Sequence, residues 1–458
     1  MSHLLLLGCL TALAAPAAEP PNIVHIIADD LGWNDVGYHG SEIPTPHIDR
    51  LARGSIRLDR FYVTPICSPT RAGALTGRYP FRFGIFDGVC SPASRHGLPP
   101  GETTVPELLA GAGYPRRALV GKWHLGLASD RFHPLNHGFT SFYGHYNGAI
   151  DYFSRRRFGQ LDWHRDRRPA REDGYSTDLI GREAARIIRE AERPFYLLVA
   201  FNAPHSPIQA TRDDLDAVGF DPDGPRAPNT DAGLGRREGS PGYGETGKGN
   251  TVRQTFAAMT RALDRNLGRI LEALEESGQE DHTLLVFHSD NGAIPRHGGS
   301  NRPLRGNKHT TWEGGTRVVA MIRWPARLGE GRRFAHPTCY LDLLPTFAGA
   351  AGVPLPPGID GIDLLPLLEG RAALPERTLL LGRDTAVSTR WKLKGDALFD
   401  LIEDPRESRD LAARHPETLR RLRQELAAFA SMAGPPCVSP LPAPDSWPPV
   451  DWSLPPEP

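Results

Sequence analysis

Three short apolar runs, each followed by polar residues, limit the folds that are open to this chain. The runs at 22–27, 195–201 and 283–287 are rich in β-branched and aromatic residues, as buried strands are. Amphipathic helical patterns separate them, for example at 179–192 and 255–276. Strands that alternate with helices predict an α/β fold with a large, mostly parallel central sheet flanked by helices.

Polar side chains follow each of these runs. Asp29 and Asp30 follow the first, His205 the second, and Asp290 and Asn291 the third. In a parallel sheet the ligand crevice lies outside the carboxyl ends of the strands, so we expect these groups to converge. Carboxylate and amide oxygens suit calcium or magnesium far better than zinc. Adjacent aspartates at a strand end also occur as turn or cap residues, which leaves a structural reading open.

The segment 67–78, Cys-Ser-Pro-Thr-Arg-Ala-Gly-Ala-Leu-Thr-Gly-Arg, predicts a helix with a reactive start. Pro69 suits a first helical turn and places Cys67 at the helix N-terminus, where free N–H groups and the dipole favour negative charge. Arg71 shares the helical face of Cys67. The segment therefore indicates an anion-binding nucleophile, although a buried cysteine beside a solvated arginine has the same local pattern.

The sequence Gly-Lys-Trp-His-Leu-Gly at 121–126 follows another apolar run. In an extended segment residues two apart point the same way, so Lys122 and His124 can reach one site while Trp123 faces the opposite side. A surface lysine beside a packed histidine is the alternative for this tripeptide alone.

The segment around Cys67 resembles the signature of the Cys-type sulfatases, a family with an alkaline phosphatase-like fold, whose Cys-x-Pro-x-Arg core is read by a maturation enzyme. The resemblance implies that a formylglycine-generating enzyme oxidises Cys67, and that the aldehyde hydrate is the nucleophile. The segment 121–126 resembles a second hallmark of the family. There the lysine, here Lys122, binds sulfate, and the histidine, here His124, holds the hydrate and acts as the base that expels sulfate.

The resemblance also implies one calcium ion per chain. Its ligands would be Asp29, Asp30, Asp290, Asn291 and the side chain derived from Cys67.

Two further segments, 203–205 and 304–315, are similar to parts of the family that contact the sulfate ester near its leaving oxygen. They imply that His205 and Lys308 bind sulfate and protonate the leaving group. The complete implied catalytic set is Cys67, Arg71, Lys122, His124, His205 and Lys308, of which Lys122, His205 and Lys308 bind the substrate.

The chain is expected to divide into four parts. Residues 1–18 resemble a secretory signal, 19–375 would form the catalytic domain, 376–434 a smaller C-terminal α+β subdomain, and 435–458 a Pro-rich tail. A removed signal predicts a secreted or periplasmic protein. No later run approaches the ~18 apolar residues of a membrane span, so no stable membrane insertion is expected. Beyond Cys67, at most one pair among Cys90, Cys339 and Cys437 can form a disulfide.

The 53 basic and 54 acidic residues nearly cancel, so charge makes no case for nucleic acid as a partner. The expected reaction is hydrolysis of a sulfated small molecule or saccharide. A sulfated carbohydrate is favoured, because the arginines between 155 and 171 could hold anionic groups. A solvated loop is the other reading of that segment. Two other functions remain open: a phosphonate monoester or phosphodiester hydrolase of the same superfamily, and a non-catalytic protein that binds sulfated glycans.

Overall fold

The structure is a computed structural model that describes residues 19–86, 88–91, 96–157, 159–230 and 243–434. The expected signal segment, the Pro-rich tail and Cys437 lie outside the described residues. Within them, no helix combines the length and the apolar character that crossing a membrane requires. Cys67 and Cys339 carry free, buried thiols.

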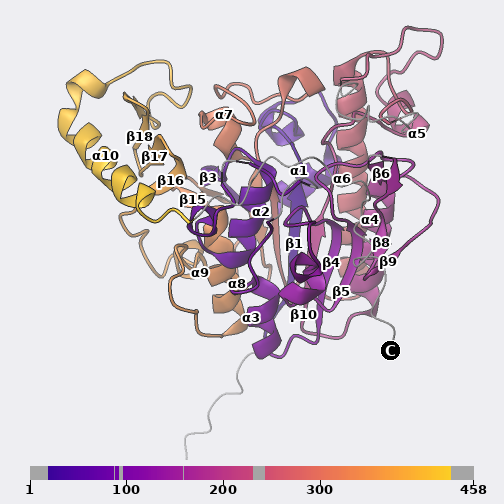
Figure 1. Ribbon diagram of the computed structural model, residues 1–458, viewed down its shortest axis with the longest axis horizontal. Helices are drawn as coiled ribbons and strands as arrows, with labels where there is room; N and C mark the ends of the chain where they lie inside the picture. Colours follow the sequence, from indigo (N-terminus) through magenta and orange to yellow (C-terminus); the bar gives the residue numbers. More distant parts are fainter. Residues whose placement is uncertain (1–18, 87, 92–95, 158, 231–242, 435–458) are drawn as a thin grey trace, which may run out of the picture.

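A large sheet runs through the middle of the molecule (Figure 1). Among the described residues it has ten strands, in the order β14-β2-β13-β11-β1-β10-β4-β5-β8-β9. The five consecutive strands from β11 to β5 are parallel, and antiparallel strands extend the sheet on both sides. This confirms the predicted mostly parallel α/β fold. The strands are β1 (Asn22–Ala28), β2 (Ile56–Leu58), β4 (Arg116–Lys122), β5 (Ser141–His145), β8 (His164–Arg165), β9 (Arg168–Pro169), β10 (Phe195–Ala200), β11 (Thr283–Ser289), β13 (Ala320–Arg323) and β14 (Arg333–Phe334).

Helices cover both faces of the sheet because its central strands are apolar on both sides. In β1, Val24 and Ile26 pack on one side, and Ile23 and Ile27 pack on the other. The first face is covered by α1 (Pro46–Arg53), α4 (Ser176–Glu190) and α6 (Val252–Glu276), and the second by α2 (Cys67–Thr76), α3 (Val105–Gly111) and α8 (Leu343–Ala351).

The two long helices begin three residues earlier than the apolar pattern predicts. The α6 helix starts after Thr251, whose side chain accepts a hydrogen bond from the backbone N–H of Gln254. The first turn of such a helix is polar, so it carries no apolar periodicity. A short helix, α5 (Arg212–Asp216), lies between β10 and α6.

A second, antiparallel sheet and one helix form the C-terminal part of the described chain. In Figure 1 this part, in orange and yellow, lies on the opposite side of the molecule from α4 and α6. It confirms the predicted small C-terminal α+β subdomain. Its elements are β16 (Leu379–Gly382), β17 (Thr385–Val387), β18 (Trp391–Lys394), β19 (Ala397–Asp400) and α10 (Pro416–Ala430).

A buried ionic cluster joins this subdomain to the large domain. Lys392 Nζ on β18 lies 3.0 Å from Glu313 Oε1 and 2.9 Å from Glu407 Oε1. Glu407 Oε2 also accepts a hydrogen bond of 2.7 Å from the backbone N–H of Glu313. Glu313 begins the short helix α7 (Glu313–Thr316), five residues after Lys308. The cluster therefore fixes the chain segment that carries Lys308 against the second sheet.

We predict that Lys392→Met lowers the free energy of unfolding by about 3–5 kcal/mol, because it removes the cation that pairs with the buried Glu407 and leaves Glu313 with only Arg317, 3.6 Å away. Urea unfolding followed by circular dichroism measures the change. Lys394→Met is the matched control on the same strand, since Lys394 is partly exposed and pairs with Asp384 at 3.2 Å. The control should lose less than about 1 kcal/mol. An equal loss in both variants would contradict the prediction.

Candidate active site

The carboxyl ends of four neighbouring parallel strands bring the predicted polar residues together. Because β11, β1, β10 and β4 are adjacent and parallel, the residues that follow them meet at one edge of the sheet. Asp29 and Asp30 follow β1, Asp290 and Asn291 follow β11, His205 lies beyond β10, Lys122 ends β4 and His124 follows it.

Cys67 occupies the predicted helix start. It is the first residue of α2, after an extended Ile66, and every residue of α2 is buried. Its sulfur and one oxygen each of Asp29 and Asp290 all lie within 4.8 Å of one another. Burial raises the pKa of the Cys67 thiol, against the positive charges of Lys122 and Lys308, which lower it. Cys67 is thus a neutral thiol in these surroundings, and a neutral thiol is a weak nucleophile.

Arg71 and Lys122 neutralise the two carboxylates beside Cys67. Lys122 Nζ lies 2.5 Å from Asp29 Oδ2. The Arg71 guanidinium donates to Asp290 Oδ2 from Nε at 3.1 Å and from Nη2 at 2.8 Å. Burial alone would lower the pKa of Arg71, but Asp290 and Asp29 raise it above its ordinary value. Both side chains are buried, and Arg71 remains charged because carboxylates face it.

Lys308 and Asn291 stabilise the negative charge of Asp30. Lys308 Nζ and Asn291 Nδ2 each lie 2.6 Å from Asp30 Oδ1. Burial alone would raise the pKa of Asp30, but the charges of Lys308 and His205 hold it below its usual range. Asp30 is therefore an anion, although it is buried.

Three buried oxygens of this group have no hydrogen-bond partner among the described residues: Asp29 Oδ1, Asp30 Oδ2 and Asn291 Oδ1. A buried oxygen without a partner costs free energy, and such atoms mark places where an ion or water binds. The three atoms come from two adjacent strands, and oxygen is the donor that calcium prefers. The residues present thus fit a hard divalent cation.

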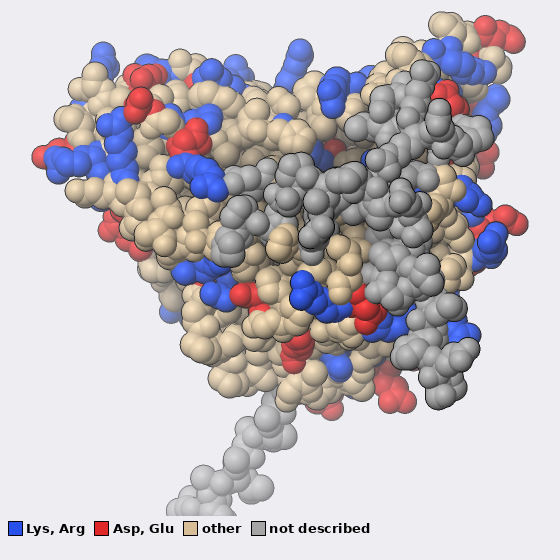
Figure 2. Space-filling view, viewed as in Figure 1, with Lys and Arg blue, Asp and Glu red and all other residues tan. Residues whose placement is uncertain are grey.

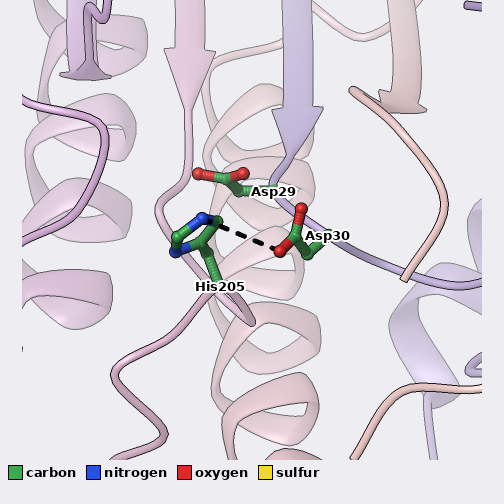
Figure 3. Close-up of side chains that lie close together, drawn as sticks. All are labelled: Asp29, Asp30 and His205. Carbon is green, nitrogen blue, oxygen red and sulfur yellow. Dashed lines mark ion pairs between the residues drawn. The ribbon is translucent and has the colours of Figure 1, made fainter. Parts of the chain in front are cut away.

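His205 belongs to the segment that follows β10, and its ring points toward Asp30 (Figure 3). Its Nε2 is 3.7 Å from Asp30 Oδ2, and its Nδ1 is 2.6 Å from the carbonyl oxygen of Ser206. A carbonyl only accepts, so Nδ1 carries a proton and Nε2 faces the site. Burial lowers the pKa of His205 to about 3, although Asp30 acts to raise it. The imidazole of His205 is therefore neutral.

His124 is held by its backbone rather than by its ring. Its backbone N–H donates to the carbonyl oxygen of Tyr146 at 3.0 Å, and its φ of 58° lies in the left-handed region. The buried ring nitrogen Nδ1 has no hydrogen-bond partner among the described residues. Burial, with Lys122 and Arg71 adding to it, keeps the pKa of His124 well below its ordinary value. Trp123 points the other way, into the core, as its place between two site residues predicts.

Sequence reasoning missed Tyr152, which places His205. The buried Tyr152 hydroxyl donates to the carbonyl oxygens of Asn202 at 2.5 Å and His205 at 2.7 Å. No motif marks this residue, because its partners lie fifty residues away in the sequence.

The structure does not support the arginines between 155 and 171 as a free anion-binding surface. Arg155 is buried and donates to backbone carbonyls of its own segment, including that of Phe153 at 2.6 Å. Arg165 pairs with Glu183 at 2.7 Å, and Arg167 pairs with Asp130. In this segment Arg155, Arg165 and Arg167 satisfy nearby oxygens, whereas Arg168 and Arg171 are exposed. The surface in Figure 2 likewise shows basic and acidic residues intermingled, as expected for a net charge of −1.

Comparison with known proteins agrees with this geometry. A family model described as Sulfatase matches residues 21–353. The steryl-sulfatase of Mus musculus is 34% identical over 84% of this chain and 71% of its own length. The N-acetylgalactosamine-6-sulfatase of Mus musculus is 33% identical over 80% of this chain and 70% of its own. The solved structure of Ps i-CgsB in complex with k-i-k-neocarrahexaose matches with a TM-score of 0.79 at 31% identity, over 91% of this chain and 94% of that one.

The matched region includes every residue of the site described above, from Asp29 to Lys308. The chain belongs to the sulfatase family and is a sulfuric ester hydrolase.

Proposed function

We propose that this enzyme hydrolyses a sulfate ester of a carbohydrate, with a formylglycine formed from Cys67 and a calcium ion beside it. The observation that carries the proposal is the convergence of Cys67, three unpartnered oxygens and three buried cations at one edge of the sheet. The assignment of a carbohydrate substrate is supported by the names of similar proteins. One is named N-acetylgalactosamine-6-sulfatase, and Ps i-CgsB was solved with a bound neocarrahexaose. Residues 1–18 support export of the protein before it acts.

Five residues would hold the calcium ion: Asp29, Asp30, Asp290, Asn291 and the side chain at position 67. Bound there, calcium supplies positive charge that draws electrons from a sulfate oxygen and makes a nearby hydroxyl more acidic. A formylglycine hydrate formed at position 67 would supply a nucleophilic hydroxyl, together with a second hydroxyl from which a base could remove the proton. A maturation enzyme would form it from Cys67 in the core Cys67-Ser68-Pro69-Thr70-Arg71.

Arg71, Lys122 and Lys308 supply the positive charge that a nucleophile needs to approach a sulfate ester. The sulfur of a sulfate monoester is screened by anionic oxygens, so a nucleophile reaches it only where those oxygens are neutralised. Arg71, Lys122 and Lys308 bring fixed positive charge to the carboxylates that surround Cys67. Their positions are set before the substrate arrives, so little reorganisation is needed during the reaction.

The two histidines divide the proton transfers. His124 is neutral and has a free ring nitrogen, so it can take the proton whose removal lets sulfate leave. His205 points Nε2 into the site. An anionic ester beside it raises its pKa, and the protonated imidazole, or Lys308, can then donate to the departing alcohol.

The first prediction concerns the nucleophile. In active enzyme, peptide mass spectrometry should find the residue at position 67 with an aldehyde in place of the thiol group. Cys67→Ala should reduce kcat by ~10⁴-fold or more, the scale on which loss of a covalent nucleophile acts. Fully active enzyme with only an unmodified thiol at Cys67 would remove this part of the proposal.

The second prediction concerns the metal. Asn291→Ala removes one unpartnered oxygen and no charge, so it should weaken calcium binding by ~10–100-fold and lower kcat/KM with it. Calorimetric titration of the chelator-treated protein measures the affinity. Excess calcium should restore much of the lost activity. Unchanged calcium affinity in this variant would show that Asn291 is not a ligand.

The third prediction separates the histidines. His205→Ala should slow esters with poor leaving groups by ~10²-fold or more and aryl sulfates with good leaving groups much less, because only the former need a proton. His124→Ala should lower kcat for both kinds of ester, since it acts after the alcohol has left. Rates measured across a series of substituted aryl sulfates test this. The same leaving-group dependence in both variants would refute the division.

A further inference from the structure

Asn147 lies beside the candidate site, and none of the roles described above uses its side chain. It follows β5, the strand next to β4, and His145 at the end of β5 is the register partner of Lys122. Asn147 is only 4% exposed. Its neighbour Gly148 packs against the ring of His124: a methyl group added at Gly148 would lie 2.4 Å from both Cε1 and Nε2 of that ring. Asn147 therefore belongs to the turn that packs against the His124 ring.

The backbone of this turn is held rigidly by one carboxylate. Asp162 accepts hydrogen bonds from the backbone N–H of Tyr146 at 3.0 Å and of Asn147 at 2.9 Å. The carbonyl oxygen of Asn147 lies 2.9 Å from Nδ1 of His145. All backbone polar groups of Asn147 are thus satisfied, and its position does not depend on its side chain.

The orientation of the Asn147 amide is fixed as well. Oδ1 accepts a hydrogen bond of 3.0 Å from the backbone N–H of Gly148. A flipped amide would set two donors against each other, so Nδ2 must be the group that faces away from Gly148. Among the described residues Nδ2 has no hydrogen-bond partner, although it is buried. An unsatisfied buried donor costs about 1–3 kcal/mol, which a ligand with an acceptor would remove.

We propose that Nδ2 of Asn147 donates a hydrogen bond to an oxygen of the bound sulfate group. The inference rests on the sulfate site proposed above, to which Lys122 and His124 belong. A hydrogen bond from a neutral amide to an anionic oxygen is charge-assisted and stronger than one between neutral groups. It adds a directional contact to a site whose other sulfate ligands are cations, and so helps to orient the ester as well as to hold it.

Two substitutions isolate the donor. Asn147→Ala removes the Nδ2 donor and the acceptor for the Gly148 N–H without adding charge, and Asn147→Asp keeps that acceptor but puts an ionisable carboxyl group in place of the donor. We expect both to weaken binding of inorganic sulfate by ~10-fold or more and to lower kcat/KM for 4-nitrophenyl sulfate to a similar degree. The melting temperature should fall little in Asn147→Ala, because the lost donor was unsatisfied in the free protein and only the hydrogen bond to the Gly148 N–H is removed. Formylglycine content and calcium affinity should match wild type.

The matched control is a buried asparagine whose donor is used. Asn22 begins β1 at the opposite edge of the sheet, and its Nδ2 donates to Gln279 at 2.9 Å and Thr283 at 3.3 Å. Asn22→Ala should lower the melting temperature and leave sulfate affinity unchanged. This is the reverse of the pattern expected at Asn147.

Wild-type sulfate affinity in Asn147→Ala would overturn the inference. So would a fall in melting temperature in Asn147→Ala as large as that of Asn22→Ala, because it would show a structural role. Calorimetric binding of inorganic sulfate reports on Asn147 without turnover. An active wild-type enzyme that binds sulfate but keeps an unmodified Cys67 would therefore contradict the proposed nucleophile and leave this inference standing.

Discussion

Mutual repulsion between three buried carboxylates is the constraint on which the rest of this site depends. Asp29, Asp30 and Asp290 lie together at the ends of adjacent strands, where water does not screen them. Three buried cations balance them, each supplied by a different element: Arg71 by α2, Lys122 by β4 and Lys308 by the segment before α7. The site is therefore stable only when the sheet, α2 and that segment are all in place.

The same burial sets the protonation states that the proposed chemistry needs. It lowers the pKa values of His124 and His205, so both imidazoles are neutral before the substrate binds. Pairing with carboxylates works against burial for Arg71 and Lys308, which stay charged. The basic side chains thus fall into two groups. The two histidines are neutral and can carry protons, whereas Arg71 and Lys308, which pair closely with carboxylates, act as fixed charges. The ionic cluster of Lys392 extends this dependence to the second sheet, because it anchors the segment that bears Lys308.

Local features of the site could be predicted because each depends on a few adjacent residues. The start of α2 at Cys67 follows from Pro69, and the opposed directions of Lys122 and Trp123 follow from strand geometry. Convergence of the residues after β1, β10 and β11 follows from the parallel sheet. The arginines between 155 and 171 show where such reasoning fails. Their charge is visible in the sequence, but the carboxylates that neutralise it, such as Glu183 and Asp130, are set by folding.

The sequence by itself determined the family, the strand and helix order, and the identity of the residues that gather at the sheet edge, because these depend on local pattern and short motifs. Only the tertiary structure decided which oxygens lack partners, which bases are neutral and which side chains support the site. Tyr152 holds His205, and Asn147 presents an unpaired donor, through contacts with residues that no motif connects to them. Burial and hydrogen-bond satisfaction belong to the whole fold, since each depends on every segment that packs around an atom.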